Sequence, residues 1–258
     1  MADQTAALIT GASAGLGKTF AEQLAASGHS LVLVARRLEK LESLAESLRD
    51  RFGVEVHCLR ADLSQPEAPL TLFNAVEELG VTVDYLINNA GAAGPDLLEE
   101  RDWSQQQDNF QLMLLAIAHL CHLFIPGMRE RGFGRVINVS SVAGRIARKA
   151  GGNYGPIKAY LVALSEELNL TLAPSGVHVC ALCPGFTHTD FHETAGMMDM
   201  KNSLPAWLWY DAEVVVREGL TAVEKGKAVY LSGRLYRLLD PLFQSVFTRR
   251  LMRGPSRA

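Results

Sequence analysis

The stretch that decides the fold is Ala6-Ala7-Leu8-Ile9-Thr10-Gly11-Ala12-Ser13-Ala14-Gly15-Leu16-Gly17, near the start of a chain of 258 residues. Its apolar first part is typical of a short buried strand, and a helical pattern follows it up to Ser27. Glycines at such a strand-to-helix turn let the backbone approach a pyrophosphate, which the positive helix N-terminus also attracts. The turn therefore predicts a dinucleotide site, unless it is only a tight turn without a ligand. Its candidate residues are Gly11, Ser13, Ala14, Gly15, Leu16 and Gly17.

A second apolar strand, residues 30–35, is followed directly by Arg36 and Arg37. In a dinucleotide-binding unit this is the place of the residue that reads the adenosine ribose, where NAD sites usually carry a carboxylate. Guanidinium groups instead suit a 2′-phosphate, with which they form charge-assisted hydrogen bonds. The two arginines therefore favour NADP(H) over NAD(H). The alternative is that they only begin the solvated side of a helix over residues 38–51.

Strands and helices alternate along the rest of the chain. Apolar strand patterns cover residues 54–59, 83–87, 135–139, 177–182 and 227–231, with helical patterns between them. This alternation predicts an α/β protein with a single-domain Rossmann fold, in which helices cover both faces of a doubly wound, mostly parallel seven-stranded sheet. Ligands of such sheets bind at the carboxyl ends of the strands. Polar, charged and glycine residues follow these ends at Arg36, Asp62, Asn89, Gly91, Ser141, Pro184 and Gly185.

Length and composition fit one large soluble domain over residues 1–258. The net charge of −3 provides no basic footprint for nucleic acid. No transmembrane segment is expected, because the longest apolar run, residues 112–126, is too short to span a bilayer and contains two histidines. We also expect no cleavable signal peptide before the first strand, and the four cysteines form no disulfide framework. These features predict a cytoplasmic protein.

Tyr154 and Lys158 lie four residues apart at the start of a predicted helix over residues 154–173. On one helix face the ammonium lies beside the phenol, which is expected to lower the pKa of the tyrosine. The positive helix end acts in the same direction, and Asn153 is a candidate N-cap. The Ser141 hydroxyl is a candidate to orient a substrate oxygen. A solvated helix face shows the same pair by chance, so the surrounding motifs have to decide between the two interpretations.

Taken together, these segments resemble the short-chain dehydrogenase/reductase family over nearly the whole chain. The matching motifs are Thr10-Gly-x-x-x-Gly15-x-Gly17, Asp62, Asn88-Asn-Ala-Gly91, Ser141, Tyr154-x-x-x-Lys158 and Pro184-Gly185 followed by Thr189. Their order and spacing carry the resemblance, since each motif alone is common. Residues 181–191 are further similar to a bacterial branch of ketone and 3-oxoacyl reductases.

The resemblance implies an NADP(H)-dependent oxidoreductase that transfers hydride between the nicotinamide and a ketone or secondary alcohol. It implies that Tyr154 is the general acid, that Lys158 lowers the tyrosine pKa and holds the nicotinamide ribose, and that Ser141 binds the substrate oxygen. Cofactor contacts then extend from the glycine turn, Arg36 and Arg37 to Asp62, Leu63, Asn89, Ala90, Gly91, Tyr154, Lys158, Pro184, Gly185, Thr187 and Thr189.

One residue departs from the family's pattern. Thirteen residues before Pro126, where the family has an asparagine that helps to hold a water near the lysine, this chain has Met113. A thioether cannot replace the hydrogen bonds of an amide, and Asn109 lies one helical turn away. Three consequences of Met113 are open: turnover is slow, a backbone carbonyl alone holds the water, or catalysis is lost and the protein has an alternative function. That alternative is a catalytically weak or inactive NADP(H)-binding sensor or scaffold protein.

Residues 187–210 are expected to form a lid over the nicotinamide end of the site. The methionines and tryptophans of this segment suit a small hydrophobic substrate, such as an acyl chain or a bulky cyclic ketone. Packing in the core or at a subunit interface is the alternative. The candidate substrate contacts are Ser141, Met197, Met198 and Trp207. No metal site is expected, because His188, Asp190 and His192 lack the spacing of known ligand sets.

The C-terminal segment, residues 234–258, is an amphipathic tail that contains several arginines. Basic amphipathic ends can lie on membranes, but docking on its own domain or on a neighbouring subunit is favoured here. The resemblance also implies pairing of subunits through the long helix and the helix that carries Tyr154, for which residues 112–125 are apolar enough. We therefore expect a homodimer or homotetramer.

Overall fold

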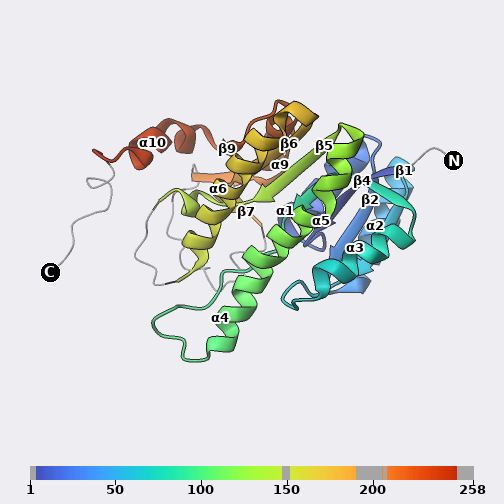
Figure 1. The fold of residues 1–258 in the computed structure, drawn as a ribbon, viewed down its shortest axis with the longest axis horizontal. Helices are drawn as coiled ribbons and strands as arrows, with labels where there is room; N and C mark the ends of the chain where they lie inside the picture. Colours follow the sequence, from blue (N-terminus) through green and yellow to red (C-terminus); the bar gives the residue numbers. More distant parts are fainter. Residues whose placement is uncertain (1–3, 147–151, 190–204, 206–207, 249–258) are drawn as a thin grey trace.

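A parallel β-sheet forms the centre of the molecule in the computed structural model, which describes residues 4–146, 152–189, 205 and 208–248 (Figure 1). Its seven strands lie in the order β3-β2-β1-β4-β5-β6-β9 and are all parallel. They are β1 (Gln4–Thr10), β2 (Ser30–Ala35), β3 (Val56–Arg60), β4 (Val81–Asn88), β5 (Gly134–Val139), β6 (Val177–Cys183) and β9 (Val229–Leu231). The predicted seven-stranded parallel sheet is confirmed.

Helices cover both faces of this sheet (Figure 1). One layer consists of α1 (Gly15–Ala26), α2 (Leu38–Phe52) and α9 (Ala212–Glu224), and the other of α3 (Ala68–Glu78), α5 (Ala116–Arg131) and α6 (Tyr154–Leu172). In α2 the buried leucines Leu41, Leu44 and Leu48 recur at the spacing of one helix face, which explains why this face packs on the sheet. Two apolar cores result, one on each side of the sheet.

The chain reverses its direction of travel through the sheet between β1 and β4. From β1 it proceeds outward to β2 and β3, and from β4 it proceeds the other way to β5, β6 and β9. In doubly wound sheets, ligands bind at the carboxyl ends of the strands where the order reverses in this way. The residues predicted to bind a dinucleotide follow the ends of β1 and β4.

The long helical run over residues 103–131 is interrupted by a different helix type. It consists of α4 (Trp103–Phe110), a π-helical turn (Gln111–Leu115) and α5. Such single π turns are frequent at functional sites, and Met113 lies in this one. Among the described residues, Trp103–Arg131 is the one helical run long and apolar enough to cross a membrane, and 39% of its most apolar 18-residue stretch is buried. Core helices of soluble proteins meet the same criteria of length and hydropathy.

A small parallel pair of strands, which was not predicted, lies beside the main sheet. It joins β7 (Phe186–His188) to β8 (Trp209–Asp211). The ring of Trp209 packs between Phe186 and His188, with centroids 5.3 Å from each. The pair thus holds together the two ends of the segment predicted to form a lid. Met197, Met198 and Trp207 lie outside the described residues.

The last described helix, α10 (Arg234–Gln244), projects from the body of the molecule (Figure 1). Its polar contacts are with its own domain, whereas several apolar side chains face outward. Leu238 is 74% exposed, Leu242 is 43% exposed, and Phe247 beyond the helix is 88% exposed. Helix α10 therefore docks on its own domain through Tyr236 and polar groups, and within the described residues several of its apolar side chains stay exposed.

Candidate functional site

Thr10 and Asn89 tie the glycine-rich turn to the end of β4. The Thr10 hydroxyl accepts hydrogen bonds from the backbone N–H groups of Asn89 and Ala90, at 3.0 and 3.1 Å. The Asn89 amide donates to the carbonyl oxygens of Thr10 and Gly11, at 3.0 and 3.3 Å. A Cβ at Gly17 would lie only 2.2 Å from the Gly11 carbonyl oxygen, so helix α1 can start this close to the turn only with a glycine there. The two predicted motifs therefore meet at one edge.

The start of α1 has the properties of an anion site. Its N-cap residue, Ala14, makes no side-chain capping hydrogen bond, and its first turn contains no acidic residue. Gly15, which has a φ of +53°, faces Thr189, since a Cβ at Gly15 would lie 3.4 Å from the Thr189 Cβ. The turn thus combines glycine backbone and a positive helix end, opposite the residue that follows β7. These groups fit a pyrophosphate.

Arginine side chains lie next to this turn at the end of β2. The Arg37 guanidinium donates to the Ser13 hydroxyl at 3.3 Å, and Arg36 is exposed beside it. Arg60, which was not predicted, is the register partner of Ala35 on the neighbouring strand. A 2′-phosphate bound here would meet cationic groups and the Ser13 hydroxyl, so the residues fit NADP(H).

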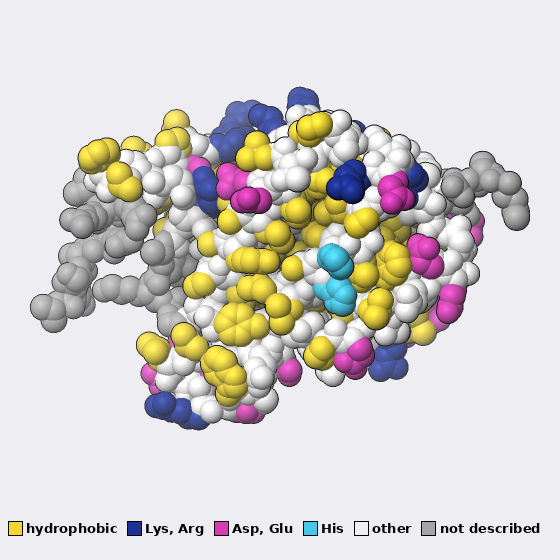
Figure 2. Space-filling view, viewed as in Figure 1, with side chains coloured by type: hydrophobic (Ala, Val, Ile, Leu, Met, Phe, Trp, Pro, Cys, Tyr) yellow, Lys and Arg dark blue, Asp and Glu magenta, His cyan; other side chains and the backbone are white. Residues whose placement is uncertain are grey.

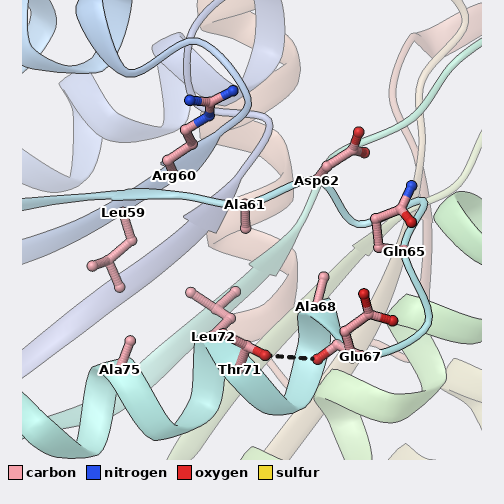
Figure 3. A pocket seen from close by; sticks show the side chains of 10 residues that line it. All are labelled: Leu59, Arg60, Ala61, Asp62, Gln65, Glu67, Ala68, Thr71, Leu72 and Ala75. Carbon is pink, nitrogen blue, oxygen red and sulfur yellow. Dashed lines mark hydrogen bonds between the residues drawn. The ribbon is translucent and has the colours of Figure 1, made fainter.

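Asp62 and Leu63 follow β3, as predicted, but they differ in exposure. The Asp62 carboxylate accepts from the backbone N–H and the hydroxyl of Ser64, at 3.1 and 2.9 Å, whereas Leu63 is buried in the core. A groove of about 260 Å³ lies beside Asp62, between the end of β3 and α3. Figure 3 shows Leu59 and Leu72 lining its apolar side. Because β3 is the edge strand, this groove lies at the margin of the sheet, away from Lys158.

Lys158 is buried beside Tyr154, with 4% of its surface exposed. Its Nζ donates to the Val139 carbonyl oxygen at 2.7 Å and lies 5.6 Å from the centroid of the Tyr154 ring. Burial lowers the pKa of Lys158 to about 8, and a charged Cys183 would act in the opposite direction. Burial also raises the pKa of Cys183 to about 11, so this thiol is neutral where Lys158 titrates. The lysine therefore exchanges protons at mildly basic pH.

The segment that begins at Ser141 packs on the first turns of α6. Ser141 caps the 3₁₀ turn Val142–Gly144, and its Oγ accepts from the Ala143 N–H at 3.1 Å, which leaves the hydroxyl proton free to be donated. A Cβ at Gly144 would lie 2.6 Å from the carbonyl carbon of Lys158, so the contact requires glycine. The Ser140 hydroxyl also donates to the Lys158 carbonyl oxygen at 2.7 Å. The three predicted catalytic residues are thereby brought to one place.

Asn153 occupies the N-cap position of α6, as predicted, but its side chain does not cap the helix. The side chain makes no capping hydrogen bond and instead donates to the Gln106 side chain of α4 at 3.0 Å. A partner from a distant helix competes here with the local backbone N–H groups, and sequence spacing contains no information about that partner.

Met113 and Lys158 both lie against Gly91, so the methionine is part of the candidate site. Its sulfur is 3.2 Å from the Ala92 backbone nitrogen and accepts that N–H. A Cβ at Gly91 would lie 3.5 Å from this sulfur and 3.9 Å from the Lys158 Nζ. Asn109 does not take its place, because its amide packs against Gly94. The thioether thus supplies an acceptor but no donor at this position.

The Pro184-Gly185 turn is connected to the Ser141 segment. The Pro184 carbonyl oxygen accepts from the Val142 N–H at 3.0 Å. The Thr187 hydroxyl is buried and donates to the Gly185 carbonyl oxygen at 3.1 Å. A Cβ at Gly185 would lie 2.0 Å from the ring of Tyr236 in α10, so this glycine leaves room for an aromatic side chain. No pattern in the sequence indicated the contact with Tyr236.

A buried series of hydrogen-bonded polar side chains, which was not predicted from the sequence, lies beneath the site. The Asn88 amide donates to the Asn138 side-chain oxygen at 2.8 Å, and Asn138 donates to the Ser165 hydroxyl at 3.0 Å. This series connects β4 and β5 with α6. An asparagine within the apolar strand over residues 135–139 is a usable sequence signal, because a buried amide needs partners.

Comparison with known proteins agrees with this geometry. The family model for short chain dehydrogenase matches residues 5–199. The chain is 33% identical to a 7beta-hydroxysteroid dehydrogenase of Collinsella aerofaciens over 182 residues. The aligned region covers 70% of this chain and 68% of the relative. A short-chain dehydrogenase from Sphingobium yanoikuyae in complex with NADPH has a TM-score of 0.80 and 32% identity, over 98% of this chain and 97% of that one.

A second solved structure is the bulky-bulky ketone specific alcohol dehydrogenase from Comamonas testosteroni. It has a TM-score of 0.78 and 29% identity, over 99% of this chain and 96% of that one. Family model, relative and solved structures therefore agree with one another on the family. The chain belongs to the short-chain dehydrogenase/reductase family of oxidoreductases.

Proposed function

We propose that this protein is an NADP(H)-dependent reductase of hydrophobic ketones, or a dehydrogenase of the corresponding secondary alcohols. The observation that carries the proposal is the buried Lys158, whose Nζ lies 5.6 Å from the Tyr154 ring while the Ser141 segment packs on the same helix. A buried cation beside a phenol is a poor choice for stability alone, since its desolvation is unfavourable. It is suited to acid–base chemistry.

In the proposed reaction the bound nicotinamide supplies the hydride that the carbonyl carbon receives. Tyr154 donates its hydroxyl proton to the carbonyl oxygen, which becomes the alcohol oxygen. The Ser141 hydroxyl donates a hydrogen bond to the same oxygen as negative charge develops on it. The Lys158 ammonium stabilises the tyrosinate that remains, with little screening by water at this depth. In the direction of oxidation, the tyrosinate takes the proton back.

The preference for NADP(H) over NAD(H) rests on Arg36, Arg37 and Ser13. The contact of Arg37 with Ser13 brings a guanidinium to the glycine turn, where a 2′-phosphate would lie. The similar structure from Sphingobium yanoikuyae contains NADPH, which supports this choice.

A bulky, hydrophobic ketone is the proposed substrate class. The similar proteins named for a hydroxysteroid and for bulky-bulky ketones support it. The aromatic contact between Trp209 and Phe186, at 5.3 Å, adds apolar surface beside Thr187 in the strand pair β7 and β8. We retain Ser141, Met197, Met198 and Trp207 as the proposed substrate contacts.

The decisive experiment measures NADPH and NADH oxidation over a panel of apolar ketones, aldehydes and 3-oxoacyl thioesters. We expect turnover by the wild type, and a loss of more than about 100-fold in kcat for Tyr154→Phe, which lacks the acid. The NADPH dissociation constant should change by less than about threefold, because all cofactor contacts except the Tyr154 hydroxyl remain. Tyr160→Phe, on the same helix and 37% exposed, is the matched control and should keep full activity.

Tight NADPH binding without turnover on any member of the panel would contradict the proposal. It would favour the alternative of an NADP(H)-binding sensor or scaffold protein, which the methionine at position 113 motivated. Turnover by the wild type would instead show that a sulfur acceptor beside Lys158 is compatible with catalysis.

A further inference from the structure

Arg145 joins the Ser141 segment to the C-terminal helix. It directly follows the 3₁₀ turn Val142–Gly144, and its backbone N–H donates to the Val142 carbonyl oxygen at 3.0 Å. Its guanidinium makes two hydrogen bonds with the carboxylate of Asp240 in α10, at 2.9 and 2.5 Å. The two side chains are only 17% and 16% exposed. A bidentate pair at this depth fixes both distance and orientation.

Further contacts from α10 reach the same region. Gln244 donates from its side chain to the Arg145 carbonyl oxygen at 2.7 Å. Tyr236, one turn before Asp240, lies directly on Gly185, because a Cβ there would be 2.0 Å from its ring. The helix therefore touches the two segments that follow β5 and β6. These segments are also joined to each other by the hydrogen bond from Val142 to Pro184.

The way α10 is attached distinguishes it from the helices that build the core. None of its residues is fully buried, and Leu238 and Leu242 face outward. Its attachment depends on Tyr236, Gln244 and two ion pairs, one from Asp240 to Arg145 and one from Arg237 to Glu218 at 3.3 Å. Elements held in this way can open locally without unfolding the protein. Loss of one anchor is therefore expected to affect the segments that it holds more than the global stability.

We infer that α10 acts as a clamp on the active site, holding the Ser141 segment through the Arg145–Asp240 pair and the Pro184-Gly185 turn through Tyr236. The inference deepens the proposed function and rests on it. Arg145, Asp240 and Tyr236 are positioning residues that act through their neighbours. The clamp matters because the Ser141 hydroxyl has to keep its place relative to Tyr154, and small misplacements of catalytic groups slow the reaction strongly.

The test compares the wild type with Asp240→Ala and with the charge-exchanged double variant Arg145→Asp with Asp240→Arg. For Asp240→Ala we expect kcat per NADPH-binding site to fall by about tenfold, because the Ser141 segment is held less firmly. Amide hydrogen exchange should become faster in residues 141–145 and 184–188. The double variant should recover at least about half of the lost activity if the opposite charges pair again.

Glu224→Ala is the matched control. It removes the partner of Arg135, at 2.9 Å, and this ion pair lies at the amino end of β5, at the opposite edge of the sheet. We expect a drop in melting temperature comparable with that of Asp240→Ala, but an unchanged kcat per NADPH-binding site. If Asp240→Ala behaves like this control, with exchange in residues 141–145 and 184–188 unaltered, the clamp is refuted.

Failure of the proposed function gives a different result. In that case the wild type itself shows no turnover, and hydrogen exchange alone decides about the clamp. Faster exchange confined to residues 141–145 and 184–188 in Asp240→Ala then supports it, and unchanged exchange refutes it.

Discussion

At the scale of single residues, Lys158 combines a buried charge with the proposed catalysis. The residue is 4% exposed, and its ammonium has the Val139 carbonyl oxygen as a hydrogen-bond acceptor. Because burial lowers its pKa from 10.5 to about 8, the unfolded chain binds more protons than the folded protein between these two pH values. This residue therefore destabilises the cofactor-free protein most below pH 8, and the effect declines as the pH rises toward 10.5.

Lys158→Met should separate stability from activity. Near neutral pH we expect the free energy of unfolding to rise by up to about 3 kcal/mol, because the desolvation of the charge disappears. The difference from the wild type should shrink between pH 8 and 10.5, as measured by urea titrations of the cofactor-free protein. Turnover should be lost. Lys18→Met, at an exposed position of α1, should change stability by less than about 0.5 kcal/mol at every pH.

A second prediction at this scale concerns the arginines after β2 and their effect on cofactor affinity. Arg37→Ala should weaken NADPH binding by about tenfold or more, because a charge-assisted hydrogen bond to the 2′-phosphate is lost. NADH binding should change by less than about twofold, since NADH has no such phosphate. Arg36→Ala should act in the same direction. Fluorescence titrations measure both constants, and Arg51→Ala, at the far end of α2, is the control. Equal weakening of both cofactors would refute the assignment.

At the scale of elements, the junction of β1 and α1 depends on a close backbone contact. Gly17→Ala adds a Cβ methyl group, which would lie 2.2 Å from the Gly11 carbonyl oxygen and 2.6 Å from the Asn89 side-chain amide nitrogen. The turn and the start of α1 must then move apart, which we expect to weaken the binding of both cofactors by more than about tenfold.

The measurement for Gly17→Ala is cofactor affinity together with the melting temperature. Gly155→Ala, at the start of α6, serves as a milder comparison, because its Cβ would be 3.1 Å from the Ala143 carbonyl oxygen. Unchanged cofactor affinity in Gly17→Ala would show that the turn does not bind the pyrophosphate.

At the scale of the whole molecule, one face has an apolar surface that a single chain leaves uncovered. Figure 2 shows apolar side chains gathered on the side formed by α4, α5 and α6. Exposed apolar residues of α4, of the π-helical turn and of α6 include Trp103, Leu115 and Tyr160, which are 57%, 51% and 37% exposed. Exposed apolar surface of this kind is typical of subunit interfaces. The homodimer or homotetramer expected from the sequence remains a prediction, and this face is the part of the structure that supports it.

Leu115→Glu tests that prediction. A carboxylate in a dry interface is strongly unfavourable, so light scattering should show a smaller assembly or a monomer for the variant. The wild type should have twice or four times the mass of one chain. Leu79→Glu, at the end of α3 and 39% exposed, should leave the assembly intact. A monomeric wild type would refute the prediction.

The sequence by itself determined the fold and the membership of the site. Alternating strand and helix patterns determine a parallel sheet, because each element has to bury an apolar face against its neighbour. The candidate residues follow the carboxyl ends of the strands, and a parallel sheet brings all these ends to one edge. The glycine turn, Ser141, Tyr154 and Lys158 therefore meet without further information.

The tertiary structure alone decided the contacts between distant segments. Examples are Asn153 with Gln106, Arg145 with Asp240, and Tyr236 on Gly185. Local patterns are set by the period of a helix or a strand, within a few residues of the chain. Arg145 and Asp240 lie 95 residues apart, and their pairing depends on how the layers pack. The sequence therefore specifies the candidate catalytic groups, and packing specifies what holds them in position.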